Sequence, residues 1–428
     1  MSTISLLERY GRAPSGAHVS CLVCRACGHE TPIEATNICE RCFGPLEVRY
    51  DYEEVARRIS RERIAAGPAS IWRYRDLLPI DLDTTEPITL GEGFTPLVHA
   101  RNLGVELGLR NLYVKNDTQN PTGSFKDRVV SVAATWAREH GLTTIACAST
   151  GNLANAVAAY AAHAGLRAVV VVPSDLEPAK MIGTSIFRPT LIAVEGSYDD
   201  VNRLCSELSD CVDWGFCNLN LRAYYSEGSK TLTFETTEQL GWRLPDEIIV
   251  PVASGCQFVK HRKAAGELID LGLVDAGSRL PRLTGAQAAG CSPVATAFAH
   301  DKDTVVPVRP STIARSIAIG NPSDGAEVLA IARETGGVVE SVTEDELVEG
   351  IELLAASEGI FAETAGGVTV AVLRKLARSG RWQGHETVVA YITGAGLKTA
   401  DCVTSRAGVP VPVPASLRAV RERYSGLI

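Results

Sequence analysis

The sequence predicts an α/β protein with two lobes built on parallel sheets, preceded by a small cysteine-rich element. Three observations predict this class. Apolar runs rich in β-branched residues alternate with helical patterns from about residue 70 onward. The length of 428 residues exceeds what one compact core usually organises. Finally, five of the 12 cysteines lie within the first 42 residues.

The cysteine-rich element comes first in the chain and has the spacing of a metal-binding ribbon. Cys24-x-x-Cys27 and Cys39-x-x-Cys42 are separated by 11 residues, so two tight turns can each offer two thiolates to one tetrahedral ion. We therefore expect a structural Zn²⁺ site, because four thiolates leave no open position for catalysis. The alternatives are a ribbon that folds without metal or a disulfide, which a reducing cytosol disfavours. Cys21 is a possible competing ligand.

The parallel sheets are predicted from apolar runs that are separated by helical patterns. Strands buried on both faces have this appearance in α/β proteins, where helices connect parallel strands. Helical patterns are expected over 129–139 and 153–164. The expected strands are 112–114, 144–148, 168–173, 247–252 and 387–392.

A lysine follows the first of these strands in a glycine- and serine-containing turn. Lys126 ends the segment Pro121-Thr122-Gly123-Ser124-Phe125-Lys126 and stands at the start of the helical pattern over 129–139. The positive end of a helix dipole disfavours an ammonium there. The position thus favours the neutral amine that Schiff-base chemistry needs. Taken alone, such a lysine would more often be a surface residue.

Three other strands also end in turns that suit ligand binding. The segments 149–152, 253–257 and 393–398 each follow a predicted strand, and turns that open a helix present free backbone N–H groups. We expect the first to suit a carboxylate and the second a phosphate. Each is weak evidence alone, but parallel strands end at one edge of a sheet, where α/β proteins bind ligands.

The chain as a whole resembles the threonine synthases, within the tryptophan-synthase-β-like (fold type II) family of pyridoxal-phosphate (PLP) enzymes. The Pro-Thr-Gly-Ser-Phe-Lys-Asp motif is specific, and the resemblance extends over nearly the whole chain. Other matching segments are 42–48, 71–79, 90–97, 227–231, 238–242, 319–322 and 358–361.

The resemblance implies a cofactor site around Lys126, which would hold PLP as a Schiff base and move protons. Asn152 would hydrogen-bond the 3′-oxygen of the cofactor. Thr393 would face the pyridine nitrogen, and a hydroxyl there would leave that nitrogen unprotonated and moderate the electron sink. The remaining implied cofactor contacts are Phe125 and the phosphate loop Ala253, Ser254, Gly255, Cys256 and Gln257.

The resemblance also implies a reaction and a substrate site. The family converts O-phospho-L-homoserine and water to L-threonine and phosphate, by γ-elimination followed by addition of water at the β carbon. Ser149, Thr150 and Gly151 would bind the substrate carboxylate. Arg222 is either a phosphate clamp shifted from the usual family position or a surface arginine.

Four departures from the family pattern fall in the same segments. Leu153 follows Asn152 where the family has Thr or Ser, and Gly255 is the only glycine of the phosphate loop. Tyr225 stands at the usual arginine position, and Ala395 replaces a common histidine. These departures leave the PLP assignment intact and weaken the substrate assignment.

Two alternative functions therefore stay open. The first is a related PLP enzyme, either cysteate-synthase-like, acting on O-phosphoserine and sulfite, or a serine or threonine dehydratase. The second is a non-catalytic zinc-ribbon binding protein that kept the fold, although an intact Lys126, Asn152 and Thr393 argue against it.

The expected architecture is an N-terminal arm with the zinc ribbon and two lobes that hold PLP between them. We expect the arm over 1–66, the large PLP-binding lobe over 67–129 and 246–428, and the small mobile lobe over 130–245. The prolines of 408–414 predict an extended tail laid over the surface. Enzymes of this fold are commonly dimers, so a homodimer is expected by analogy.

Composition narrows the partners and the location. The formal charge of −8 gives no electrostatic reason to bind nucleic acid. No apolar stretch approaches the roughly 18 to 20 residues needed to span a membrane. The first nine residues are too polar for a signal peptide, which makes the cytoplasm the expected location.

Overall fold

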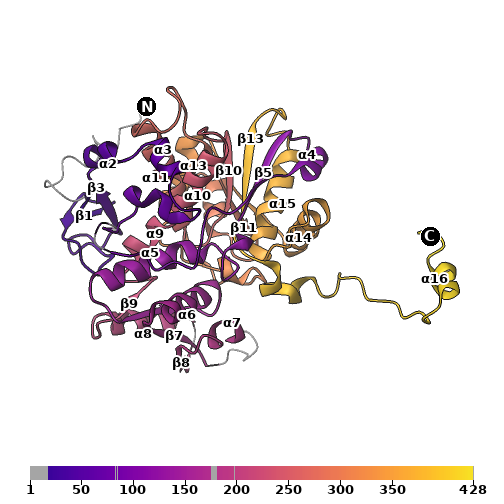
Figure 1. Ribbon diagram of the computed structural model, residues 1–428, viewed down its shortest axis with the longest axis horizontal. Coiled ribbons are helices and arrows are strands. Elements are labelled where there is room, and N and C mark those ends of the chain that lie inside the picture. Colours follow the sequence, from indigo (N-terminus) through magenta and orange to yellow (C-terminus); the bar gives the residue numbers. More distant parts are fainter. Residues whose placement is uncertain (1–17, 82, 84, 175–180, 197, 428) are drawn as a thin grey trace.

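The N-terminal ribbon is a separate antiparallel sheet in the computed structural model, which describes residues 18–427 apart from 82, 84, 175–180 and 197 (Figure 1). Its strand order is β2–β1–β3. The strands are β1 (Val19–Cys24), β2 (Glu30–Thr31) and β3 (Leu46–Tyr50). Short helices follow it, namely α2 (Tyr52–Arg58), α3 (Arg61–Ala65) and the 3-10 helix η1 (Ile71–Leu77).

The larger of the two remaining sheets has six strands in the order β12–β11–β10–β13–β5–β4. All its strand pairs are parallel except the edge pair β4–β5, which is antiparallel and was not predicted. Along β10, Ile248 and Val250 pack on one face while Ile249 packs on the other, as expected for a strand buried on both sides. The bounds are β4 (Leu97–His99), β5 (Asn111–Asn116), β10 (Glu247–Pro251), β11 (Arg282–Ala288), β12 (Val339–Val342) and β13 (Thr387–Ile392).

Helices cover both faces of this sheet. On one face pack α4 (Arg101–Leu107), α14 (Glu344–Glu358) and α15 (Thr364–Arg378). On the other pack α10 (Lys230–Gln239), α11 (Cys256–Asp270), α12 (Pro293–Ala299) and α13 (Gly325–Thr335). The start of α14 is fixed by a capping box between Thr343 and Glu346, which satisfies backbone N–H groups at the helix end.

The smaller sheet has four parallel strands in the order β8–β7–β6–β9. Along β6, Ile145 and Cys147 pack on one side and Ala146 and Ala148 on the other. The strands are β6 (Thr144–Ala148), β7 (Arg167–Pro173), β8 (Thr190–Val194) and β9 (Gly215–Phe216). The helices of this part are α5 (Lys126–Glu139), α6 (Asn152–Ala164), α7 (Ile182–Ser185), α8 (Tyr198–Ser209) and α9 (Arg222–Glu227).

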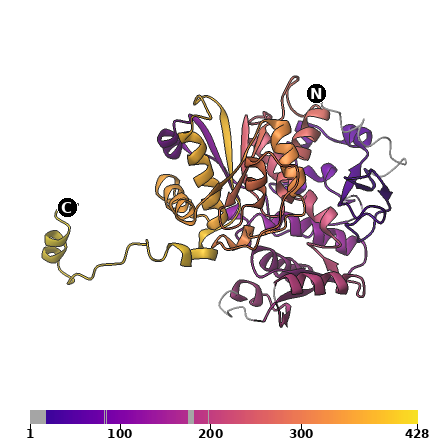
Figure 2. The same cartoon turned by 180° about the vertical axis from the view of Figure 1, so that it is seen from behind.

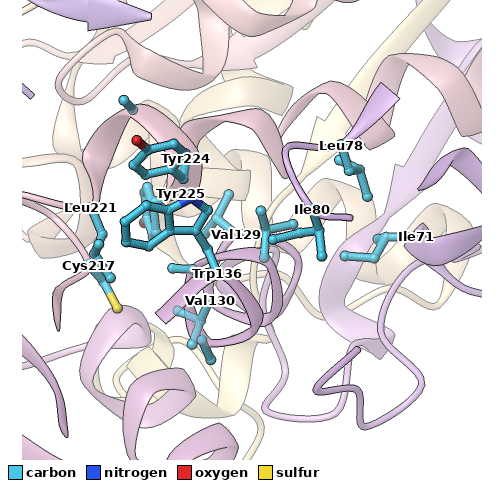
Figure 3. Close-up of a cluster of buried hydrophobic side chains, with 14 of the residues drawn as sticks. Ile71, Leu78, Ile80, Val129, Val130, Trp136, Cys217, Leu221, Tyr224 and Tyr225 are labelled. Carbon is cyan, nitrogen blue, oxygen red and sulfur yellow. The ribbon is translucent and has the colours of Figure 1, made fainter. Parts of the chain in front are cut away.

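The ribbon shares its core with the helices of the smaller sheet. Trp136 of α5 stacks on Tyr224 of α9, with ring centroids 4.1 Å apart, inside a buried cluster that Figure 3 shows. Leu22 and Val48 of the ribbon belong to the same cluster. The ribbon is therefore packed against the body of the protein through a shared hydrophobic core.

The C-terminal segment differs from the expectation. After the 3-10 helix η5 (Gly396–Val403), residues 408–414 are almost all exposed and α16 (Leu417–Arg423) buries none of its residues. Figures 1 and 2 show this segment extending away from the body, so the prediction that it lies over the surface was wrong. The prolines do keep it extended, because they remove backbone donors. None of the described helices has the length and apolar character needed to cross a membrane.

Candidate active site

Three of the predicted ligand-binding turns leave one edge of the six-stranded sheet. β5, β13 and β10 are neighbours and parallel, so their carboxyl ends at Asn116, Ile392 and Pro251 lie at the same edge. This is the edge at which open parallel sheets bind ligands.

The lysine turn and the turn after β13 are joined directly. The Phe125 backbone N–H donates to the Thr393 carbonyl at 2.9 Å, and the Ala395 N–H donates to the Gly123 carbonyl at 2.9 Å. Gly123 has a φ of 73°, which a residue with a side chain rarely adopts. The predicted convergence of these two turns is therefore present in the fold.

Asn152 connects this edge to the smaller sheet. Its Nδ2 donates to both carboxylate oxygens of Glu363, at 3.1 and 2.9 Å, and both side chains are buried. Glu363 comes just before α15, and a Cβ at Gly394 would meet its carboxylate at 2.5 Å. A glycine is thus required at position 394 for the close approach of the Thr393 turn to this pair.

Lys126 begins α5, as the sequence predicted, and its amine is surrounded by other side chains of the protein. Nζ donates to the Tyr225 hydroxyl at 2.9 Å and lies 4.6 Å from the centroid of the Phe125 ring. Burial lowers the pKa of Lys126 to about 8, with a smaller lowering by Arg222, while Cys256 and Glu363 act in the opposite direction. Near physiological pH a minority of these amines is therefore neutral, which is far more than for an ordinary lysine, and the largest cause is loss of solvent.

Two of the groups near the lysine, the Tyr225 phenol and the Cys256 thiol, hold their protons. Burial raises the pKa of the Tyr225 phenol well above its ordinary value, and burial also raises the pKa of the Cys256 thiol. Neither group competes with Lys126 as a base. Tyr225 stands where the family pattern has an arginine, and the labelled residues of Figure 3 place it among Val129, Trp136 and Cys217.

The predicted phosphate loop has a conformation that only its glycine allows. Gly255 has a φ of 94°, and a Cβ there would meet Asp324 and Val328 at 2.9 and 2.8 Å. The 15-residue helix α11 begins directly after it at Cys256, so the first N–H groups of the helix lie beside the loop. The Asp324 N–H donates to the Ser254 carbonyl at 2.9 Å, which ties the loop to α13.

The predicted carboxylate loop opens α6 of the smaller sheet. Ser149 and Thr150 are partly exposed, Gly151 is exposed, and the Gly151 N–H donates to the Ser149 hydroxyl at 3.3 Å. The loop directly precedes Asn152, the first residue of the helix. It is therefore accessible at a helix N-terminus, where an anion is stabilised.

Arg222 is held by an acidic partner. It begins α9, its side chain is 22% exposed, and its guanidinium donates to the carboxylate of Asp324. Arg222 is thus partly buried and ion-paired, which is compatible with either of the two roles predicted for it. A cavity of about 20 Å³ adjoins it, lined in part by Cys256 and Lys260.

The four predicted metal ligands form one compact group. The sulfur atoms of Cys24, Cys27, Cys39 and Cys42 all lie within 4.8 Å of one another, and two of the pairs are 3.4 and 3.7 Å apart. Cys21 is not part of this group. On β1 it is paired in register with Arg49 of β3.

Two site residues were not found from the sequence. Glu363 holds Asn152, and Lys398 has a buried Nζ for which the described residues supply no hydrogen-bond partner. Burial lowers the pKa of Lys398, against the charges of Glu363 and Asp127. Lys398 lies in the turn 393–398, which the sequence already indicated as a ligand-binding turn. No motif in the sequence marks Glu363, because Glu363 reaches the site only through the packing of α15.

Comparisons with known proteins identify the family at the level of sequence. Residues 88–394 match the family model of pyridoxal-phosphate-dependent enzymes. The threonine synthase of Methanocaldococcus jannaschii is 36% identical over 93% of this chain and 98% of its own length. That of Methanosarcina acetivorans is 37% identical over 96% of this chain and 99% of its own length.

Solved structures agree at the level of the fold. Maize serine racemase matches with a TM-score of 0.61 at 20% identity, over 73% of this chain and 91% of that one. A tomato threonine deaminase matches with a TM-score of 0.59 at 17% identity, over 93% of this chain and the whole of that one. The fold is thus PLP fold type II, and the chain belongs to the threonine synthase family of pyridoxal-phosphate-dependent enzymes.

Proposed function

We propose that this protein converts O-phospho-L-homoserine and water to L-threonine and phosphate. The observation that carries the proposal is the buried amine of Lys126, with its lowered pKa, at the shared strand edge of a chain that is 36 to 37% identical to two threonine synthases over more than nine-tenths of its length. A lysine of this kind is the group that PLP chemistry requires.

The residues at this edge fit PLP by their chemistry. Lys126 would hold the cofactor covalently, and the 253–257 loop at the start of α11 would bind its phosphate through backbone N–H groups. Phe125 would pack beside it, and the Thr393 hydroxyl would meet the pyridine nitrogen. When bound, PLP supplies an electron sink that stabilises negative charge on the substrate.

Lys126 would then act as the base of the reaction. With a pKa of about 8, its amine can take the α proton of the substrate and release it, and then do the same at the β carbon. The Tyr225 hydroxyl, 2.9 Å from Nζ, would hold the amine in place while it is not bonded to the cofactor. Because Tyr225 stays protonated, it does not itself remove these protons.

Asn152 would orient the cofactor ring by hydrogen-bonding its 3′-oxygen. Glu363 fixes the amide of Asn152 at 2.9 and 3.1 Å, so this buried carboxylate is a positioning residue. Ser149, Thr150 and Gly151 would bind the substrate carboxylate at the start of α6, and Arg222 would bind its phosphate.

The ribbon fits a structural zinc ion. Tetrahedral Zn²⁺ with Zn–S bonds of about 2.3 Å places its sulfur ligands roughly 3.8 Å apart. The observed separations of 3.4 and 3.7 Å for Cys24–Cys42 and Cys27–Cys39 agree with such a site. All four positions would be filled by thiolates, so the metal would stabilise the ribbon without taking part in the reaction.

Three further proposals concern organisation. The large PLP-binding lobe would comprise residues 67–129 and 246–428, and the small lobe would comprise residues 130–245. An N-terminal arm over 1–66 would precede them. The protein would act as a homodimer in the cytoplasm. Light scattering on the purified full chain tests the oligomeric state.

A product assay tests the reaction. The PLP-loaded protein is given O-phospho-L-homoserine, and threonine and phosphate are measured, with Lys126→Ala as the blank. Equal amounts of threonine and phosphate are expected, and none from the variant.

Two parallel assays separate the alternatives. O-phosphoserine with and without sulfite tests a cysteate-synthase-like activity, and L-serine and L-threonine test a dehydratase. Turnover of only one of these would keep the PLP chemistry, reject threonine synthesis and direct attention to Leu153 and Tyr225. Absence of the visible absorbance of bound cofactor would instead favour a non-catalytic protein.

A further inference from the structure

Two arginines from distant parts of the chain converge on one buried carboxylate beside the predicted phosphate loop. Arg25 lies between Cys24 and Cys27 in the first turn of the ribbon, and Arg222 begins α9. Both guanidinium groups donate to Asp324, one to each carboxylate oxygen. The Asp324 side chain is 2% exposed and that of Arg25 13%. The ribbon therefore reaches the edge of the active site through a charged side chain.

These residues line a small cavity beside the start of α11. The cavity, of about 20 Å³, is lined by Arg25, Arg222, Cys256, Lys260 and Asp324 among others. That is room for about one water molecule. Arg222 and Cys256 both act on the pKa of Lys126, so the cavity and the amine belong to one electrostatic environment.

One donor of a residue that lines the cavity lacks a hydrogen-bond acceptor within the described part of the chain. The Nε of Arg25 is buried and has no hydrogen-bond partner among the described residues. Glu327 takes a second contact from Arg25, at 2.5 Å, but one carboxylate at Asp324 serves both guanidiniums. The start of α11 at Cys256 adds the positive end of a helix. A phosphate, with three oxygens and a higher charge, matches planar guanidinium groups better than a single carboxylate does.

We propose that Arg25 and Arg222 form a phosphate subsite in which the Asp324 carboxylate stands in for the phosphate until a ligand arrives. The phosphate displaces that carboxylate, because the cavity is too small to hold both. The inference rests on the proposed function only for the source of the phosphate, which is the substrate or the cofactor. It gives the ribbon a binding role that four filled thiolate positions do not provide.

Arg25→Gln is the test variant, and the chain offers a matched control. Arg41 lies between Cys39 and Cys42 in the second turn of the ribbon and is exposed, so Arg41→Gln makes the same charge change at a corresponding position. Binding of inorganic phosphate to the PLP-loaded full chain is measured by calorimetry. Arg25→Gln is expected to bind it roughly tenfold more weakly, from the loss of charge-assisted hydrogen bonds. Arg41→Gln is expected to match the unchanged protein.

The variant Asp324→Asn is expected to change the affinity for phosphate in the opposite direction. Removing the competing negative charge frees both guanidiniums, so phosphate is expected to bind several-fold more tightly than to the unchanged protein. A salt bridge that only holds the ribbon in place predicts no gain in phosphate affinity in this variant. The pair of opposite effects is therefore specific to a phosphate subsite.

Two further measurements on Arg25→Gln identify whether the bound phosphate belongs to the substrate or to the cofactor. If it is the substrate's, Arg25→Gln raises KM for O-phospho-L-homoserine and leaves binding of L-threonine, which has no phosphate, unchanged. If it is the cofactor's, the variant weakens binding of PLP to the cofactor-free protein and leaves binding of pyridoxal unchanged. Either result supports the subsite.

The inference is overturned if Arg25→Gln and Arg41→Gln behave alike in all of these measurements, or if Asp324→Asn does not tighten phosphate binding. Melting curves check that each variant folds, and Arg25→Lys replaces Arg25→Gln if the latter does not, because it keeps the charge and loses the planar fork. If phosphate binding follows the variants but no threonine is formed, the proposed function fails and the subsite stands.

Discussion

At the scale of single residues, the decisive property is the environment of one amine. Lys126 is the residue that the motif singled out, and the sequence argument ascribed its reactivity to the start of a helix. In the fold it does begin α5, but burial is the largest cause of its lowered pKa. The helix position and the removal of solvent therefore act in the same direction, and the second depends on α9, which supplies Tyr225.

The first prediction follows from that pKa. Below pH 8 most of the Lys126 amines carry a proton, so the rate of PLP capture by the cofactor-free protein is expected to fall about tenfold per pH unit. Above pH 8 the rate is expected to level off, because the amine is already neutral. Stopped-flow absorbance over pH 6 to about 10 measures this, with a lysine peptide as the comparison, whose rate keeps rising towards about pH 10.4. A protein profile that follows the peptide would contradict the lowered pKa.

At the scale of elements, glycine turns at strand ends bring the site together. Gly123 and Gly255 both have positive φ, and Gly394 lies against the carboxylate of Glu363. A residue with a side chain would strain or displace each turn. These glycines therefore fix how closely the loops after β5, β10 and β13 approach their neighbours, which are respectively the turn after β13, the start of α13 and Glu363.

Gly255→Ala tests this element. The change places a side chain at a φ of 94° and brings its Cβ within 3 Å of Asp324 and Val328, so we expect a loss of about 2 to 3 kcal/mol of unfolding free energy. PLP affinity is expected to fall as well, because the start of α11 moves. Gly277→Ala is the control, since Gly277 has a φ of 83° with nothing within 4 Å of its Cβ. Its expected loss is about 1 kcal/mol, and chemical denaturation that gave equal losses for both variants would contradict the packing argument.

At the scale of the whole molecule, the ribbon is joined to the body in three ways. Leu22 and Val48 share a buried cluster with α5, and Arg25 reaches Asp324 next to the phosphate loop. The third connection is a second ion pair, in which Lys260 of α11 donates to Glu47 of β3 at 2.5 Å. Changes in the ribbon are therefore expected to reach the active site.

Removal of zinc tests that connection. A chelator is expected to lower the apparent Tm by several degrees, because structural zinc contributes directly to folding. Cys39→Ser is expected to have the same effect without a chelator. Cys211→Ser is the control, because Cys211 is exposed and outside the group of four sulfurs. Purified protein that contains no zinc and melts at the same temperature with and without chelator would reject the metal site.

The sequence by itself determined the class of fold, five of the parallel strands (β5, β6, β7, β10 and β13) and the turns that follow four of them, because apolar periodicity and turn chemistry are local properties. The parallel strands β8, β9, β11 and β12 were not predicted. It also indicated the family, since the motif around Lys126 is specific and further matching segments extend over nearly the whole chain. The tertiary structure decided which side chains meet. Glu363 with Asn152, Tyr225 with Lys126, and Arg25 with Asp324 are separated by 211, 99 and 299 residues in the chain. No local pattern encodes such pairs, because they form only when whole helices and sheets pack.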